Sequence, residues 1–209
     1  MQTLNQFKTQ ISFWPTLRSW VLIARVRGVT SNLVFAIIAA LLICLASSTR
    51  LTVIFSDKQL EYLWPFIPLL ACFPLLKAIK QWLSDREICA ARAILRRITT
   101  YLIITFMNCV IFLTLSGSHG FAATRNYLLF SAVIMIFATL VSITLSWLPA
   151  MIFVLVCWFA GRDLQYSPRS WAIPLHESNI TWTLGFCLAS WGIGLALLAW
   201  NPALVIARR

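Results

Sequence analysis

Residues 77–101 read KAIKQWLSDREICAARAILRRITTY, and they form the only long, densely charged stretch between two strongly apolar segments of the chain. Ser84 and Glu87 have the spacing of a capping box, in which each side chain satisfies an unpaired backbone N–H at the start of a helix. Apolar residues then recur at helical spacing, at Ile88, Ala91, Leu95 and Ile98. The pattern predicts an amphipathic helix over 84–97.

Charged side chains occupy several other positions of this predicted helix. Asp85 and Glu87 lie in its first turn, and Arg92 and Arg96 lie one turn apart, away from the apolar stripe. A helix of this kind between two membrane spans can dock onto a partner protein or lie on a lipid surface. The sequence leaves both alternatives open.

Composition places the whole chain in a membrane. Of its 209 residues, 60% are hydrophobic and only 11% are charged, with a mean hydropathy of +0.84. Soluble domains carry about twice that share of charge. We therefore expect one all-α integral domain over 1–209, and we interpret the formal charge of +11 as membrane topology and lipid contact, not nucleic-acid binding.

The apolar segments predict six transmembrane helices, at about 29–48, 60–76, 98–115, 127–145, 150–160 and 182–200. The fifth is short and could instead form a re-entrant pair with the fourth. Residues 13–27 predict an interfacial amphipathic helix, although they could also begin a long first span. Residues 161–181 predict a hairpin outside the membrane.

Two spans contain residues that predict unusual packing. The second span carries Pro65, Pro68 and Pro74, which predict a bent or locally unwound helix that faces protein and not lipid. In the first span, Ala36 and Ala40 are a small-residue pair that suits close helix contact.

The sixth span has a stripe of small residues on one helical face, formed by Gly185, Ala189, Gly192 and Ala196. Such a stripe lets another helix backbone approach closely. The approaching helix could be the first or fifth span of the same chain, or a helix of a second subunit.

Cations are distributed unequally between the two predicted sides. Twelve Lys and Arg residues fall on the side of the termini and of residues 77–97, and five fall on the other side. The positive-inside rule then places both termini in the cytoplasm of a bacterial inner membrane.

Catalytic patterns are missing from the sequence. It contains no HExxH, GxSxG, GxGxxG or GxxxxGK[ST] motif, and no CxxC pair among its six cysteines. His119 and His176 fall in predicted outer loops. No Asp, Glu, Lys, Arg or His falls in the middle of a predicted span, which argues against an ion-driven carrier. We expect no catalytic residue, cofactor or metal site, and any transport energy must come from another polypeptide.

The order of these elements resembles the membrane subunit of type-2 ABC exporters, the ABC-2 permease family. That family combines an interfacial helix, six spans, a cytoplasmic coupling helix between spans two and three, tightly joined spans four and five, and an outer hairpin before span six. The segments of this chain that match are 13–27, 84–97, 146–149 and 161–181. The family's acidic residue after span two has candidates in Asp85 and Glu87.

The resemblance implies a separate ABC ATPase, a second permease subunit that is identical or different, and contact with membrane lipids. The ATPase would dock on residues of the charged helix, namely Ser84, Asp85, Glu87, Ile88, Ala91, Arg92 and Leu95. An exported amphipathic, lipid-like or peptide substrate could pass Trp64, Phe66 and Pro68.

Two rival functions remain open at this stage. One is the membrane-embedded substrate-binding subunit of an energy-coupling-factor importer, which would bind a vitamin by itself. The other is a non-transporting assembly factor, immunity protein or scaffold, which the scarcity of polar groups in the predicted spans also fits.

Overall fold

A computed structural model describes residues 29–47, 50–52, 60–82, 93–163, 165, 167–176 and 181–200. In this part of the chain the α-helices are α3 (Val29–Ala46), α4 (Phe73–Trp82), α6 (Ala93–Leu115), α7 (Gly120–Leu140), α8 (Trp147–Ala160) and α9 (Thr181–Trp200). The 3-10 helices are η1 (Trp64–Cys72), η2 (Gly117–His119) and η3 (Ile173–Leu175). The predicted helical class is confirmed. The structure also contains an antiparallel pair of three-residue strands, β1 (Arg50–Thr52) and β2 (Leu60–Tyr62), in which Arg50 pairs with Tyr62.

Four helical segments are long and apolar enough to cross a membrane: Val29–Ala46, Ile98–Leu115, Gly117–Leu140 and Trp182–Ala199. Two shorter apolar segments, Trp64–Leu76 and Trp147–Ala160, lie where the second and fifth spans were predicted. The described part of the chain therefore has four helices that could span a membrane, which is consistent with the predicted membrane protein. Crossing by the two shorter segments stays a prediction.

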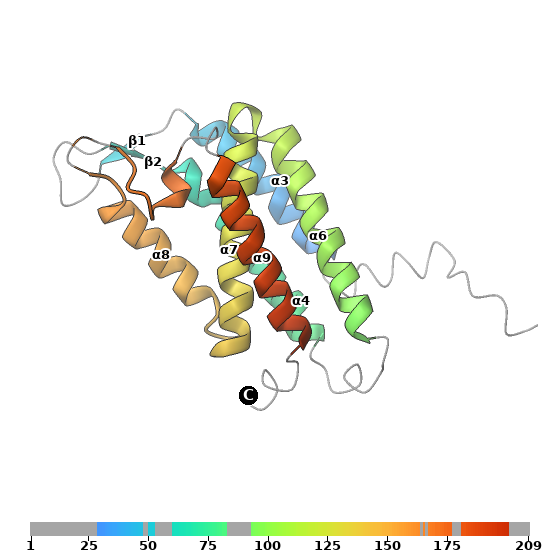
Figure 1. Ribbon diagram of the computed structural model, residues 1–209. Coiled ribbons are helices and arrows are strands. Elements are labelled where there is room, and N and C mark those ends of the chain that lie inside the picture. Colours follow the sequence, from blue (N-terminus) through green and yellow to red (C-terminus); the bar gives the residue numbers. More distant parts are fainter. Residues whose placement is uncertain are drawn as a thin grey trace, which may run out of the picture.

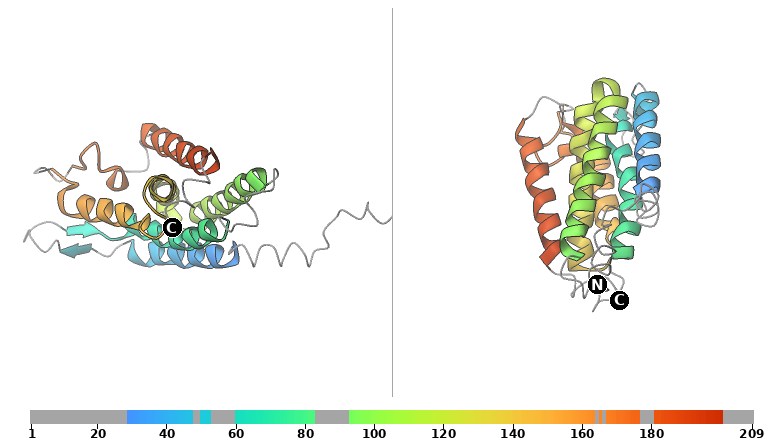
Figure 2. Two further views of the ribbon diagram at one scale, coloured as in Figure 1. Left: turned by 90° about the horizontal axis from the view of Figure 1, so that it is seen from below. Right: turned by 90° about the vertical axis from the view of Figure 1, so that its right-hand side faces the viewer.

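Consecutive elements alternate in direction along the bundle (Figure 1). The starts of α3 and α6 and the ends of α4 and α9 lie at one end, which we call the linker end (Figures 1 and 2). The strand pair, η3 and the α6–α7 turn lie at the other, which we call the hairpin end (Figure 1). The up-and-down order is the one that six spans would have.

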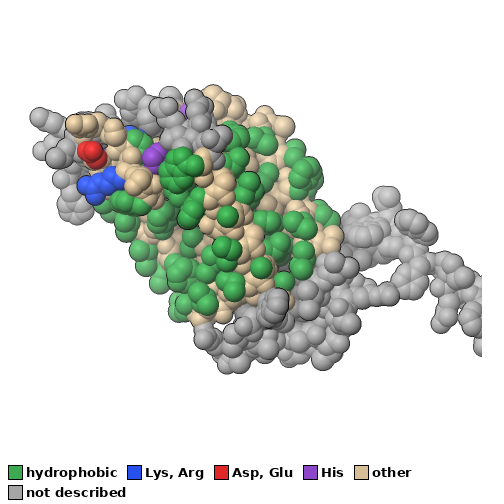
Figure 3. All heavy atoms as spheres, viewed as in Figure 1, with side chains coloured by type: hydrophobic (Ala, Val, Ile, Leu, Met, Phe, Trp, Pro, Cys, Tyr) green, Lys and Arg blue, Asp and Glu red, His purple; other side chains and the backbone are tan. Residues whose placement is uncertain are grey.

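Helix α7 is the centre of the bundle, and it packs against α9, η1, α6 and α8 (Figure 2). Some 78% of its apolar window is buried, against 28% or less for the other three long windows. Small residues such as Ala123, Ser131 and Ala138 face inward, so neighbouring helices can approach closely. The outer helices turn large apolar side chains outward, as a lipid-facing surface requires (Figure 3).

The proline-rich second segment is broken, as predicted. Pro65 and Pro68 lie in η1, a nine-residue 3-10 helix, and Pro74 lies in the first turn of α4, where its missing N–H costs nothing. Nearly all of η1 is buried against α3 and α7. At about 2.0 Å per residue in η1 and 1.5 Å in α4, the pair extends about 33 Å, close to the thickness of a bilayer core.

The fourth helix begins earlier than predicted. The spans predicted at 98–115 and 127–145 leave residues 116–126 between them, but only Gly117–His119 form a turn before α7 starts at Gly120. Gly117 has φ +58, and a Cβ on Gly120 would lie 2.8 Å from the carbonyl oxygen of Phe112. Both glycines permit a turn too tight to foresee from polarity.

This early start moves Arg125 into a helix, where its side chain is fully buried. Arg125 lies five residues after the start of α7, so it is a buried charge near one end of this helix and not in the middle of a predicted span. The guanidinium keeps its proton in proteins, so it supplies no titrating site for ion coupling.

Other boundaries shift by a few residues. Helix α7 ends at Leu140 and α8 begins at Trp147, so the junction predicted at 146–149 is the turn 141–146. Residues 93–97, predicted to end the charged helix, are the first turns of α6. The remainder of that helix, 84–92, and the interfacial helix 13–27 lie outside the described residues.

Candidate functional site

An arginine cluster closes the hairpin end of the bundle. The guanidinium of Arg125 on α7 donates hydrogen bonds to the carbonyl oxygen of His176 at 2.9 Å, to Oδ1 of Asn126 at 3.1 Å and to Oγ1 of Thr183 on α9 at 3.3 Å. Its contact with the carbonyl oxygen of Pro174 is longer, at 3.5 Å. One planar, five-donor group thus joins three elements.

Asn126 extends this cluster to a fourth element. Its Nδ2 donates to the carbonyl oxygens of Pro65 in η1, at 2.9 Å, and of Pro174 in η3, at 3.1 Å. The Pro65 carbonyl has no partner inside η1, because the residue three positions on is Pro68, which lacks an N–H, and Pro174 lies near the end of the short η3. Asn126 therefore links η1 of the second segment, and η3 of the hairpin, to α7 by hydrogen bonds.

A second polar group, the asparagine cluster, lies deeper in the bundle and links three helices. Nδ2 of Asn108 on α6 donates to Oδ1 of Asn32 on α3 at 2.7 Å and to the hydroxyl of Tyr127 on α7 at 2.8 Å. All three side chains are fully buried. Hydrogen bonds between helices in an apolar solvent favour one relative rotation of the helices, so the cluster specifies how α3, α6 and α7 fit together.

Neither cluster offers reactive chemistry. Among the described residues, the hydrogen bonds of both clusters join amides, hydroxyls, backbone carbonyls and one guanidinium, and none of them involves a carboxylate or a histidine ring. Within the described ranges, no group of three or more His, Cys, Asp or Glu side chains could hold a metal ion. What these clusters do is position helices.

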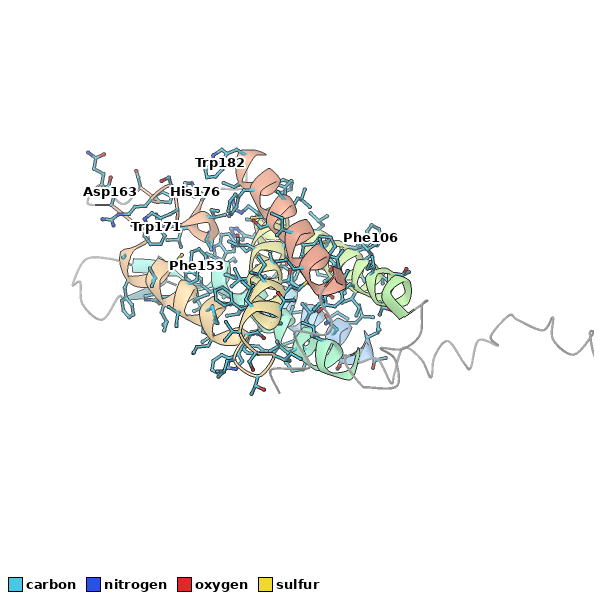
Figure 4. All side chains as sticks on the ribbon, turned by 60° about the horizontal axis from the view of Figure 1, so that its bottom comes forward. Phe106, Phe153, Asp163, Trp171, His176 and Trp182 are labelled. Atoms are coloured by element: carbon cyan, nitrogen blue, oxygen red, sulfur yellow. The ribbon has the colours of Figure 1, made fainter. Side chains whose placement is uncertain are left out.

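An apolar groove of about 450 Å³ opens at the side of the bundle, between α8 and α9. Leu129 and Val133 of α7 form its floor, Phe153 of α8 one wall, and Trp182 and Phe186 of α9 the other. Figure 4 shows Phe153 below the hairpin and Trp182 at the start of α9.

Residues of the hairpin cover the upper end of this groove: Ser170, Trp171 and Ile173. They are held in place because the hairpin closes on itself, through Asp163 N to Ser167 O at 3.0 Å and Arg169 N to Gly161 O at 2.8 Å. The groove is therefore a formed feature of the fold, lined by aromatic and aliphatic side chains.

Of the predicted ATPase-docking residues, the structure describes only Leu95. Ser84, Asp85, Glu87, Ile88, Ala91 and Arg92 lie outside the described residues, and Leu95 lies in the first turns of α6. The docking surface stays a prediction.

The predicted substrate path through η1 is filled by packing. Trp64 stacks on the ring of His119 with centroids 4.2 Å apart, and the buried ring of Phe66 lies 5.5 Å from that of Trp158. Pro68 is buried as well. None of the three lines the groove between α8 and α9.

The two small-residue patterns have different surroundings. Ala36 and Ala40 are fully buried in α3, which packs against η1 and α6. The stripe on α9 is exposed instead, and a Cβ added at Gly185 or Gly192 would meet no atom within 4 Å. Helix α9 contacts α7 through another face, where a Cβ at Gly194 would lie 3.2 Å from Cβ of Met135.

Sequence reasoning missed both polar clusters and the groove. A signal for the asparagine cluster was present, because Asn32 and Asn108 are amides inside apolar spans, where polar side chains are expensive and pair with one another. The groove had no such signal, since its lining comes from four separate elements.

No family model, curated protein or solved structure matches this chain.

Proposed function

We propose that this protein is the membrane-spanning subunit of an ABC exporter for an amphipathic or lipid-like substrate, driven by a separate ATPase. One observation carries the proposal: the charged stretch 77–101 contains both the end of the broken second segment η1–α4, at Trp82, and the start of α6, at Ala93. A force applied to the stretch would reach two packed elements at once, because η1 contacts α3 and α7 while α6 contacts α3 and α7.

The energy source is assigned to a partner because the chain has no phosphate-binding glycine loop. The resemblance to ABC-2 permeases supplies the class of partner. The excess of cations at the linker end favours a cytoplasmic location for that end and for both termini, where an ATPase is found. A bacterial inner membrane is the corresponding location.

A second permease subunit, identical or different, completes the proposal. The exposed stripe of Gly185, Ala189, Gly192 and Ala196 is a surface on which another helix can pack closely. Such a contact would bury a face of α9 that contains no charged residue.

The docking surface can be tested by affinity purification of the full-length protein from its native membrane. Glu87→Arg and Ile88→Asp each change the predicted docking helix, and we expect both to remove a co-purifying ABC ATPase. Asp163→Arg is the matched control, since it reverses one exposed charge at the hairpin end. An ATPase that stays bound to both docking variants would refute the proposed coupling.

The same purification separates the rival functions. A vitamin-binding subunit would retain a small molecule when purified alone, and a scaffold would co-purify with membrane proteins but with no ATPase. The groove argues against the vitamin alternative, because among the described residues that line it Ser170 supplies the one hydroxyl and none carries a charge.

A further inference from the structure

The groove between α8 and α9 has the depth of one membrane leaflet. Trp182 is the second residue of α9, at the hairpin end, whereas Leu129 and Val133 lie nine and thirteen residues along α7 from its start at that end. At 1.5 Å per residue these positions are about 14 and 20 Å deep, and half of a bilayer core is about 15 Å thick. The groove thus runs from the interface toward the middle of the membrane.

Its lining suits a hydrocarbon chain. Seven of the eight lining residues are aliphatic or aromatic, and Ser170 stands at the hairpin. A volume of about 450 Å³ lies at the lower end of the range for small-molecule sites. A flexible chain entering from the side would bury apolar surface on both itself and the aromatic walls.

The rim of the groove differs from its floor. Trp171 and Trp182 are exposed there, as expected of indoles at headgroup depth. Nε2 of His176 donates to the carbonyl oxygen of Arg169 at 3.0 Å, and the His176 ring lies edge-on to Trp182 with centroids 6.1 Å apart. His176 therefore connects the hairpin to the start of α9 across the mouth of the groove.

Charge at the rim favours an anion. Arg169 is exposed and directly precedes Ser170, which lines the groove. The carboxylate of Asp163, which accepts a hydrogen bond from the backbone N–H of Gln165 at 3.0 Å, offsets one of the two arginines, Arg162 and Arg169, so the described charges of the hairpin sum to +1. Figure 3 shows charged side chains beside the apolar surface at this end of the molecule.

We propose that this groove binds one acyl chain of an anionic phospholipid from the leaflet at the hairpin end, with the lipid phosphate beside Arg169. The chain would lie along Leu129, Val133 and Phe153, and the glycerol region would lie between Trp171 and Trp182. This site goes beyond the proposed export function, because it needs neither an ATPase nor transport.

The test uses the full-length protein in nanodiscs of phosphatidylcholine, without ATPase or ATP, doped with phosphatidylglycerol that carries a diazirine at mid-chain. After irradiation, mass spectrometry locates the labelled peptides. We expect labelling around Leu129–Val133 and Phe153 to exceed labelling around Phe106 by about fivefold, the ratio for roughly 1 kcal/mol of preference. Phe106 is 67% exposed on α6 and lies far from the groove, so it reports ordinary surrounding lipid (Figure 4).

Two variants with a matched control examine the groove itself. Val133→Trp fills the floor, and we expect it to lower labelling at Phe153 to the level of Phe106. Trp171→Ala opens the rim without altering the floor and should lower the same labelling. This second variant tests the groove even if Val133→Trp does not fold. Leu41→Trp introduces the same side chain at a 51% exposed position of α3, a helix that contributes no lining residue to the groove, and should change nothing.

The headgroup preference is measured with a phosphatidylcholine probe bearing the same diazirine chain. Arg169→Gln should make the two probes label the groove equally, and Arg169→Lys should preserve the preference for phosphatidylglycerol. The proposal is overturned if labelling is equal at Phe106 and in the groove, if both probes label the wild-type groove equally, or if Val133→Trp and Trp171→Ala label like wild type.

Discussion

Nδ2 of Asn108 on α6 donates a 2.7 Å hydrogen bond to Oδ1 of Asn32 on α3, and the two residues are 76 positions apart in the chain. The same nitrogen donates to the hydroxyl of Tyr127. The outward faces of α3 and α6 are apolar and exposed, so they do not favour any one rotation of either helix about its axis. The buried hydrogen bond between Asn108 and Asn32 does favour one rotation.

Replacing Asn108 with Leu should destabilise the bundle. The change removes both donations and leaves the Asn32 carbonyl oxygen and the Tyr127 hydroxyl in an apolar interior, at an expected cost of about 1–2 kcal/mol. Reversible unfolding of the purified protein in mixed micelles with increasing SDS measures this cost.

The control for Asn108 is Thr114→Val on the same helix. Oγ1 of Thr114 bonds only to backbone carbonyls of its own helix, at Val110 and Ile111, so its loss should change the unfolding free energy by a few tenths of a kcal/mol at most. Equal stability of Asn108→Leu and wild type would show that the asparagine cluster does not hold α3 to α6.

Arg125 should stabilise the hairpin locally, and its replacement should leave the stability of α6 unaffected. Arg125→Met removes the donor to the His176 and Pro174 carbonyls, so residues 168–176 should exchange backbone hydrogens faster. A loss of about 1.5–3 kcal/mol of local stability corresponds to roughly a 10- to 100-fold increase in exchange rate. Hydrogen–deuterium exchange with mass spectrometry reads this segment directly.

Arg125→Lys is the informative companion variant. Lysine keeps the charge but lacks the planar fork that reaches Asn126, Thr183 and His176 together, so it should restore only part of the protection. Full protection in Arg125→Lys would mean that charge alone matters. Faster exchange in α6 to the same extent would mean that Arg125 stabilises the whole fold and not the hairpin.

Two glycines on α9 should respond oppositely to the same substitution. Gly194→Leu inserts a side chain where even a Cβ would lie 3.2 Å from Met135 and 3.3 Å from the carbonyl oxygen of Ala132, and we expect a loss of about 1–3 kcal/mol. Gly192→Leu places the same side chain in open space and gains helix propensity. Thermal unfolding of the monomer in detergent compares them, and similar losses for both would contradict this packing.

The association of subunits gives a prediction for Gly192 that is independent of folding. If the stripe on α9 contacts a second subunit, Gly192→Leu should abolish the complex while leaving the fold intact, because the helices can no longer approach closely. Native mass spectrometry from nanodiscs measures the stoichiometry. Leu188→Ala, on an exposed position outside the stripe, serves as the control. An unchanged complex in Gly192→Leu would rule out the stripe as the contact.

Local sequence predicted the helical segments well. The apolar windows of α3, α6 and α9 coincide with predicted spans because hydrocarbon solvent requires every backbone hydrogen bond to close inside the segment. The unwound second segment was equally predictable, because Pro65 and Pro68 cannot donate to an α-helical ladder.

The ends of segments were harder to predict. Residues 120–126 are polar enough to resemble a loop, yet they begin the most buried helix of the bundle. Arg125 and Asn126 are accommodated there because carbonyl oxygens of the hairpin and of η1 accept their hydrogen bonds. Those acceptors are distant in the chain, so no local pattern shows them.

The sequence by itself determined that this is a helical membrane protein, where its long helices run and where its second segment breaks, because these follow from composition and backbone sterics within a few turns. Only the tertiary structure decided that α7 is central, that Arg125 is buried, that α9 packs through Gly194 while Gly192 stays exposed, and that a groove opens beside α8. These features depend on the rotation of each helix about its axis. Contacts between residues far apart in the chain, such as Asn32 with Asn108, select that rotation.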